Sequence, residues 1–184
     1  MWARENDFDA EISAAAAGNP QRIAILKALC GIESSFNPAA MRREPDGRVS
    51  YGLTQILDQT ARGLGYTGEL RLLLDPALHL GWAMRYLLEL EGQVGTSNMP
   101  ELFSAWNCGA QRRADAWHSR CARPGQTYVN QAYVDKAMRA YSYFSGQGGG
   151  GGDIASSLSS IPPQTLVLVL VAGVAVLVVS GVLG

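Results

Sequence analysis

The stretch that decides the fold runs from residue 19 to residue 38 and reads NPQRIAILKALCGIESSFNP. It opens with Asn19-Pro20, an asparagine that can cap a helix and a proline suited to the first helical turn. Apolar residues then recur at steps of three and four, at Ile23, Leu26, Leu29 and Cys30. Because this is the period of a helix with one buried face, and Pro38 ends it, the stretch predicts one amphipathic helix.

Glu33 lies on the apolar face of that expected helix. It follows Cys30 by three residues, Leu29 by four and Leu26 by seven. Burial disfavours a charged carboxylate, so the pKa of Glu33 should be raised. A protonated carboxylic acid can donate a proton to a glycosidic oxygen, which is what cleavage of a glycan needs. The spacing alone also allows a glutamate at a helix end that is capped or points into water.

The rest of residues 1–145 also reads as helical. Three more segments carry helix starts or helical spacing: Asp75-Pro76 onward, Asn98 to Cys108, and Thr127 to Phe144. A further helix is expected to begin within Ser50–Ile56, and Arg48–Tyr51 beside the Asp46-Gly47 turn could form a small hairpin. Strand signals are otherwise nearly absent, so we predict an all-α (mainly α) domain.

The composition changes after residue 145. Residues 146–164 are rich in Gly, Ser and Pro, which is typical of a flexible linker. Residues 165–184 contain no charged residue and are mostly Val and Leu. A helix of about 20 apolar residues can cross a bilayer, so we expect one C-terminal transmembrane helix rather than a buried core helix. The predicted organisation is a domain over 1–145, a linker over 146–164 and a membrane helix over 165–184.

Charge and titratable residues exclude several kinds of partner. Fifteen Lys and Arg against sixteen Asp and Glu leave no basic excess for a nucleic acid. His79 and His118 lack neighbours at metal-ligand spacing, so neither a metal nor another cofactor is expected. Cys108 and Cys121 could form a disulfide in an oxidising compartment or remain thiols. The charged N-terminus has no apolar run, so no cleavable signal peptide is expected.

Three ordered motifs resemble the signature of lytic transglycosylases of the soluble-transglycosylase (SLT) type, which are relatives of goose-type lysozyme. They are Glu33–Pro38 (ESSFNP), Gly52–Ile56 (GLTQI) and Ala105–Gly109 (AWNCG). Leu74–Leu78 and Tyr128-Val129 also resemble family elements, so the resemblance covers about residues 20 to 145.

The resemblance implies a lysozyme-like helical domain with a groove for peptidoglycan glycan strands. Glu33 would protonate the glycosidic oxygen and then, as a carboxylate, take a proton from the C6 hydroxyl of the muramoyl residue. That internal attack closes a 1,6-anhydro ring. The acetamido group of the substrate would stabilise the positive centre, so a second protein carboxylate is not required.

The resemblance also implies substrate-binding positions, namely Ser34, Gln55, Trp106, Asn107 and Tyr128. Four of them have a structural alternative: Gln55 as an exposed helix glutamine, Ser34 bonded to backbone, Asn107 as a helix cap and Tyr128 in the core. Two departures stand out. Trp106 replaces the family tyrosine whose hydroxyl lies near the acid, and Arg42 stands about where some members have a serine.

Other functions share these features. A hydrolytic muramidase would make the same cut with water as the acceptor. A non-catalytic delivery protein would only bind glycan, while its apolar tail inserts into an envelope. The compact domain with its apolar tail suits an enzyme of a bacteriophage virion that opens the wall for genome entry, acting in the host periplasm with virion proteins as partners. A secretion-system wall enzyme is the other setting.

Overall fold

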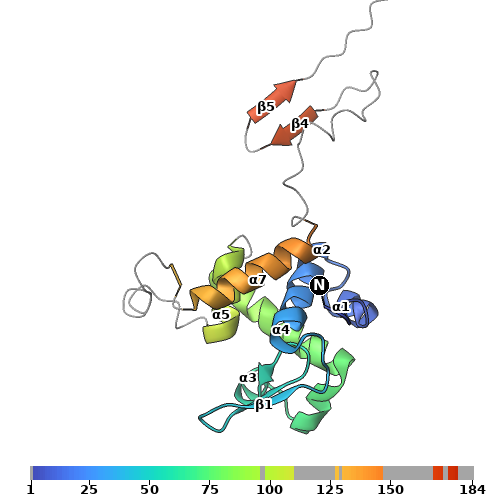
Figure 1. Ribbon diagram of the computed structural model, residues 1–184, viewed down its shortest axis with the longest axis vertical. Coiled ribbons are helices and arrows are strands. Elements are labelled where there is room, and N and C mark those ends of the chain that lie inside the picture. The colour runs from blue at the N-terminus through green and yellow to red at the C-terminus, as the bar shows by residue number, and fades with distance from the viewer. Residues whose placement is uncertain are drawn as a thin grey trace, which may run out of the picture. The chain divides into compact units, whose positions relative to one another are not determined.

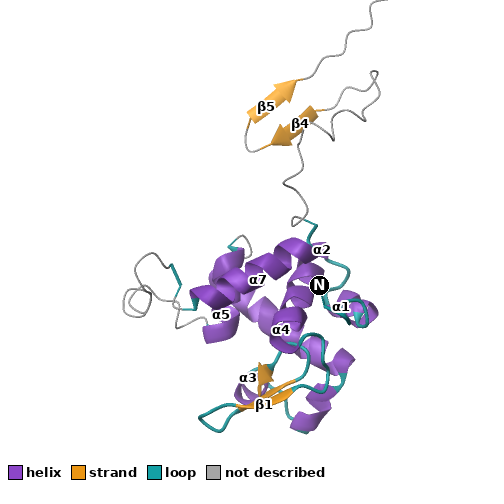
Figure 2. Ribbon diagram, in the orientation of Figure 1, coloured by secondary structure: helices purple, strands orange, loops and turns teal. Residues whose placement is uncertain are grey.

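The computed structural model describes residues 2–95, 98–109, 127–128, 130–146, 168–171 and 174–177. The chain divides into two compact units, Met1–Gly148 and Gly149–Gly184. Figures 1 and 2 show that the first unit is built mainly of helices, with a small sheet on one side. The predicted mainly helical class is therefore confirmed for this unit.

The first unit contains helices α1 to α5 and α7, a short 3-10 helix η1 and strands β1 to β3. In chain order these are α1 (Asp9–Ala15), α2 (Pro20–Ser34), β1 (Met41–Arg43), β2 (Val49–Tyr51), β3 (Ile56–Leu57), α3 (Asp58–Gly63), η1 (Leu70–Leu74), α4 (Pro76–Val94), α5 (Met99–Cys108) and α7 (Gln131–Phe144).

Side-chain caps start the three helices that carry most of the core. Asn19 accepts a hydrogen bond from the backbone N–H of Arg22 at 3.1 Å, and Asp75 accepts one from Leu78 at 2.8 Å. Asn98 caps α5 in the same way, and all three helices have a proline in their first turn. These caps satisfy N–H groups that have no partner within the helix, and they explain why the helices begin at these residues. The predicted starts of the three helices are confirmed. Only α7 begins later than predicted, at Gln131 instead of Thr127.

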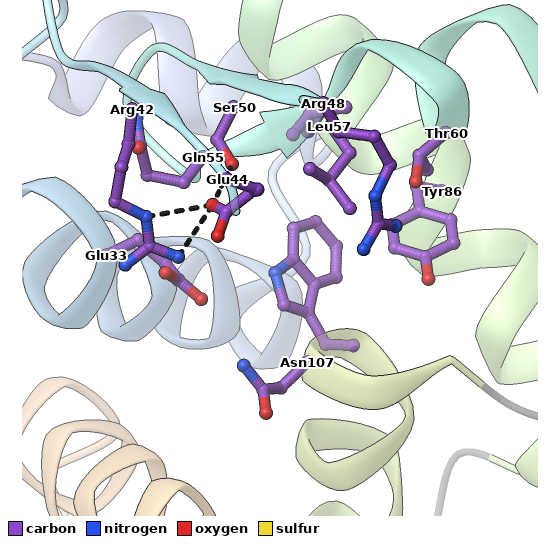
Figure 3. A pocket seen from close by; sticks show the side chains of 12 residues that line it. Glu33, Arg42, Glu44, Arg48, Ser50, Gln55, Leu57, Thr60, Tyr86 and Asn107 are labelled. Carbon is purple, nitrogen blue, oxygen red and sulfur yellow. Dashed lines mark hydrogen bonds and ion pairs between the residues drawn. The ribbon is translucent and has the colours of Figure 1, made fainter. Parts of the chain in front are cut away.

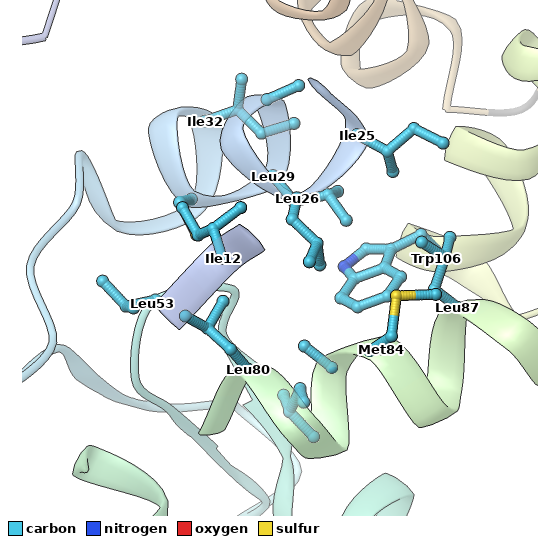
Figure 4. Packing of buried hydrophobic residues seen from close by; sticks show 14 of the residues in the cluster. Ile12, Ile25, Leu26, Leu29, Ile32, Leu53, Leu80, Met84, Leu87 and Trp106 are labelled. Carbon is cyan, nitrogen blue, oxygen red and sulfur yellow. The ribbon is translucent and has the colours of Figure 1, made fainter. Parts of the chain in front are cut away.

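Helix α2 lies at the centre of the core. Leu26 and Leu29 are fully buried and face residues of α4, among them Leu80 and Leu87 (Figure 4). Helix α7 packs against both α2 and α5. The end of α2 is therefore enclosed by helices on one side, while its last turn lies near the small sheet.

The sheet forms where the sequence predicted a hairpin, but it extends further than expected. β1 pairs antiparallel with β2 across the Asp46-Gly47 turn, and β2 pairs with β3. The expected helix over Ser50–Ile56 is wrong, because these residues form β2, a tight turn and the start of β3. In the turn, Gly52 has a φ of +68° and Gln55 a φ of +51°, and neither angle fits a right-handed helix.

A buried histidine holds this turn in place. The Nε2 of His79 accepts a hydrogen bond from the backbone N–H of Thr54 at 3.0 Å and lies 2.9 Å from its hydroxyl. The Nδ1 of His79 lies 3.0 Å from the carbonyl oxygen of Leu73, so the proton is on Nδ1. Burial lowers the pKa of His79 from 6.5 to about 4. The neutral ring thus ties α4 to the turn that carries Gln55.

We expect His79 to make the stability of the domain depend on pH. The unfolded chain takes up the proton near pH 6.5 and the folded chain only near pH 4, so the stabilisation is complete above pH 6.5 and is lost as the pH falls to 4. The loss is about 3 kcal/mol. Urea unfolding at pH 7 and pH 4 should show a smaller pH effect in His79→Gln than in the wild type. An equal effect in both chains would contradict a neutral, buried His79.

The C-terminal unit differs from the prediction of a membrane helix. Leu168–Val171 forms β4 and Val174–Leu177 forms β5, and the two strands pair antiparallel. Val has a branched Cβ that favours extended backbone, so a Val-rich run supports strands as readily as an apolar helix. Within the part of the chain that the structure describes, no helix is both long and apolar enough to span a bilayer. The expected helix over 165–184 is thus not confirmed.

Candidate active site

Glu33 lies in the last turn of α2, where the helix is stopped abruptly. Ser35 and Phe36 both adopt left-handed backbone, with φ of 54° and 61°, and the N–H of Phe36 bonds back to the carbonyl of Cys30 at 3.0 Å. The Phe36 side chain is fully buried and anchors this reversal. The chain therefore leaves the helix just after Glu33, and its carboxyl group lies at the wall of an open cavity (Figure 3).

The cavity has a volume of about 160 Å³ and lies between the end of α2, the sheet and the end of α5. It is lined by Glu33, Arg42, Glu44, Arg48, Ser50, Gln55, Ile56, Leu57, Thr60, Tyr86, Trp106 and Asn107. Most of these side chains are polar, and two aromatic rings are among them. Polar groups with flat apolar surfaces are what a sugar-binding cleft needs, since sugar rings carry hydroxyls at their edges and C–H groups on their faces.

The Glu33 carboxyl group is held by one strong hydrogen bond. The hydroxyl of Tyr133 on α7 donates to Glu33 Oε1 at 2.6 Å. Burial raises the pKa of Glu33, and the negative charge of Glu44 adds to this; the Tyr133 hydrogen bond and the charges of Arg42 and Lys136 oppose it. Burial is the largest effect, so the raised pKa predicted from the helical spacing is confirmed in direction.

Tyr133 was not among the site residues expected from the sequence. The chain contains two Tyr-Val pairs, Tyr128-Val129 and Tyr133-Val134, and only the first was assigned to the site. The later pair lies on α7, where packing against α2 brings it to Glu33 across 100 residues of sequence. Tyr133 thereby supplies a hydroxyl beside the acid, which Trp106 cannot do. Tyr133 lies within α7, which begins at Gln131, whereas Tyr128 lies before the helix. The position of the helix start therefore decides which of the two tyrosines reaches Glu33.

We expect Tyr133→Phe to move the pH dependence of glycan cleavage. Loss of the donor removes a contact that favours the charged carboxylate, so the pKa of Glu33 rises and its proton is kept to higher pH. The alkaline limb of the pH–rate profile should move to higher pH, and kcat should fall about tenfold because the carboxyl group is less well oriented. Tyr143→Phe is the matched control, since its hydroxyl on the same helix bonds to Glu5 away from the cavity. A limb that moves to lower pH would refute this role.

Three of the predicted substrate-binding residues line the cavity with Glu33. Gln55 donates through its Nε2 to the carbonyls of Gly52 and Ala40, at 2.9 and 3.2 Å, so its side chain is fixed within the turn. Trp106 lies 4.9 Å from the Tyr86 ring, centroid to centroid. The Oδ1 of Asn107 accepts a bond from Asn130 at 3.0 Å. The structure thus brings these three side chains together, and their contacts with substrate stay predictions.

Ser34 and Tyr128 do not line the cavity. The Ser34 hydroxyl donates to the carbonyl of Leu53 at 2.7 Å and so joins the end of α2 to the turn. Tyr128 lies beside Asn98, which starts α5. Both contacts join neighbouring segments of the domain, so both residues fit a structural role. Cys121 and His118 lie outside the described residues, and the Sγ of Cys108 donates to the backbone of Ser104.

Side chains of the small sheet and its hairpin form a cavity wall that was not expected from the sequence. Arg42, Glu44 and Ser50 lie there, and Glu44 was not expected at the site because it lies outside the three sequence motifs. Pairing of Arg42 with Ser50 across β1 and β2 brings both to the same carboxylate. The sequence predicted only a small hairpin at Arg48–Tyr51 beside the Asp46-Gly47 turn, and a hairpin prediction does not say which side chains face the cavity.

Comparison with known proteins places this arrangement in a family. Residues 11–129, which include Glu33 and every residue that lines the cavity, match the transglycosylase SLT domain family. The chain belongs to this family. The resemblance read from the three sequence motifs is therefore confirmed, and with it the class of enzyme, a lytic transglycosylase domain.

The fold of the SLT domain is also found among solved structures. The 70 kDa soluble lytic transglycosylase of Escherichia coli is similar, with a TM-score of 0.61 and 21% sequence identity over 77% of this chain. The match covers only 24% of that larger chain, so the likeness concerns the fold of one part of it. No curated protein matches the sequence. Tyr133 lies just beyond the matched residues, in helix α7 of the same compact unit.

Proposed function

We propose that this SLT domain cleaves the β-1,4 bond between N-acetylmuramic acid and N-acetylglucosamine in peptidoglycan, and leaves a 1,6-anhydro end. One observation carries the proposal: a carboxyl group with a raised pKa lies in an open, polar cavity and is oriented by a tyrosine. Such a group is protonated over more of the pH range than an exposed glutamate, as an acid that donates to a leaving oxygen must be.

In the proposed reaction Glu33 acts twice. Its proton passes to the glycosidic oxygen as the bond from that oxygen to C1 of the muramoyl residue breaks. The C6 hydroxyl of the same residue then forms a bond to C1, and its proton passes to the Glu33 carboxylate. The acid is restored and no water is consumed. Tyr133 favours the carboxylate form between the two steps, because its hydroxyl donates to Glu33 Oε1.

Mass spectrometry of fragments released from purified peptidoglycan tests the proposal. The full chain should release muropeptides that are lighter by one water than the hydrolysed products. A hydrolytic muramidase is the second candidate, and it is favoured by one observation, the second carboxylate of Glu44 on the cavity wall. Fragments with reducing ends would support that candidate, and binding without any release would support a glycan-binding protein.

We also propose that the uncharged segment 165–184 inserts into a membrane and tethers the domain. Its support is composition: residues 154–184 contain no Asp, Glu, Lys or Arg, and a run of this length can cross a bilayer as a helix. Insertion would replace the pairing of β4 with β5 by helix. Flotation of the full chain with lipid vesicles, together with a gain of helix in circular dichroism, is expected. A chain that stays in the aqueous fraction would reject the tether.

For the biological setting we propose local opening of the cell wall during entry of a phage genome, with the protein carried in the virion. A small glycan-cutting domain joined by a Gly-rich stretch to an apolar segment suits an enzyme that acts at one point of the envelope. Detection of the chain in purified virions is the test. Its presence in uninfected cells and absence from virions would favour a cellular or secretion-system enzyme.

A further inference from the structure

The cavity that contains Glu33 is also lined by a second carboxylate, that of Glu44. Glu44 Oε1 accepts a hydrogen bond from Arg42 Nε at 2.8 Å and one from the Ser50 hydroxyl at 3.0 Å, and Arg42 Nη2 also lies 2.8 Å away. Arg42 and Ser50 are cross-strand partners, so the sheet itself sets this geometry (Figure 3). One oxygen of Glu44 is therefore saturated with three donors.

The other oxygen of Glu44 remains available to a ligand. Among the residues that the structure describes, none donates a hydrogen bond to Oε2, and the Glu44 side chain lines the cavity at 18% exposure. Because Arg42 and Ser50 hold Oε1, they also orient Oε2, which can accept a hydrogen bond from a ligand. Glycan strands offer suitable donors there, since each sugar carries hydroxyls and an acetamido N–H.

Two roles would use such a carboxylate, and its surroundings decide between them. A base that activates water must take up a proton readily. Arg42 and Ser50 instead lower the pKa of Glu44, which makes it a weak base. The charge of Arg42 also offsets that of Glu44, so the pair adds little field at a reacting carbon. Acceptance of a substrate hydrogen bond needs neither basicity nor net charge.

We propose that Glu44, anchored by Arg42 and Ser50, binds the glycan by accepting a hydrogen bond from a sugar hydroxyl or an acetamido N–H at its Oε2 atom. This inference rests on the proposed function of the same cavity. It assigns Glu44 to substrate binding and not to activation of water. Arg42, which stands about where some relatives have a serine, is then the residue that positions it.

Glu44→Gln tests the role without removing the anchor. The amide oxygen can still accept from Arg42 and Ser50, while an N–H₂ group replaces the open oxygen and faces the donor on the sugar. KM should rise about tenfold, as expected for one lost hydrogen bond to a charged group, with the same anhydro products. Asp7→Asn is the matched control. Asp7 accepts a hydrogen bond from Arg4 Nε at 2.8 Å, neither residue lines the cavity, and KM should stay unchanged.

Binding measured separately keeps this test independent of catalysis. In a Glu33→Gln background, Glu44→Gln should weaken the affinity for purified glycan strands about tenfold. Unchanged affinity and KM would overturn the assignment. So would wild-type products with reducing ends that disappear in Glu44→Gln, because Glu44 would then activate water. A wild type that binds glycan through Glu44 but releases nothing would refute the proposed function alone.

Discussion

Replacement of Glu33 by Gln should reduce the release of peptidoglycan fragments about 10³-fold, the usual contribution of a positioned acid/base. The amide has nearly the same shape and can still accept the hydrogen bond from Tyr133, which is 2.6 Å long in the wild type. It cannot donate a proton to a leaving oxygen as an acid, and it cannot take one from the C6 hydroxyl. Both halves of the proposed reaction therefore fail, while the cavity keeps its shape.

The measurement is muropeptide release by the full chain, with glycan binding and thermal unfolding measured in parallel. Glu33→Gln should bind glycan and should unfold at a temperature no lower than that of the wild type, because the amide avoids the cost of burying a charge. Glu69→Gln is a suitable control, because Glu69 is exposed and lies outside the cavity, and it should keep full activity. Retention of activity in Glu33→Gln would mean that another residue supplies the proton.

The second large effect is expected at Gly52, in the turn of the GLTQI motif. An added Cβ would lie 2.5 Å from His79 Nδ1 and 2.7 Å from the carbonyl oxygen of Leu73. The φ of +68° is also unfavourable for a side chain. The backbone oxygen cannot move without disturbing η1, so Gly52→Ala should lower the free energy of unfolding by about 3 kcal/mol.

Chemical denaturation at neutral pH measures this loss, and Gly47→Ala is its matched control. Gly47 lies in the nearby hairpin turn with a φ of +89°, but an added Cβ would meet nothing within 4 Å. It should cost only about 1 kcal/mol, the backbone term alone. Equal losses in the two variants would show that the contacts with His79 and Leu73 do not restrict Gly52. Activity of Gly52→Ala should also fall, because Gln55 bonds to the Gly52 carbonyl.

Local signals predicted the helices well because their starts depend on neighbouring residues. Asn19 and Asp75 each cap the N–H group of the residue three positions later, so the capping pattern can be recognised in the sequence. The burial of Glu33 was predictable for the same reason, since its apolar neighbours lie on the same helix. A raised pKa follows from burial alone, and the structure bears this out in direction.

The parts that failed depend on contacts between distant segments. The turn at Gly52–Gln55 reads as the start of a helix, but bonds from Thr54 to His79 and from Gln55 to Ala40 hold it in another conformation. Tyr133 reaches Glu33 only through the packing of α7 on α2. The Val-rich segment is a separate case, because its sequence is compatible with strand or helix; β4 and β5 were not expected, and the membrane helix over 165–184 stays a prediction.

The central claim is that burial raises the pKa of Glu33. Its most direct test is a pH titration of the folded full chain in which carbon NMR monitors the Glu33 carboxyl group. We expect a pKa above the ordinary 4.5, because burial outweighs the effects of Tyr133, Arg42 and Lys136. The pKa should fall back toward that value when the domain is unfolded in urea. A folded chain in which Glu33 titrates at or below 4.5 would contradict the account, since the acid would have lost its proton before a glycan arrived.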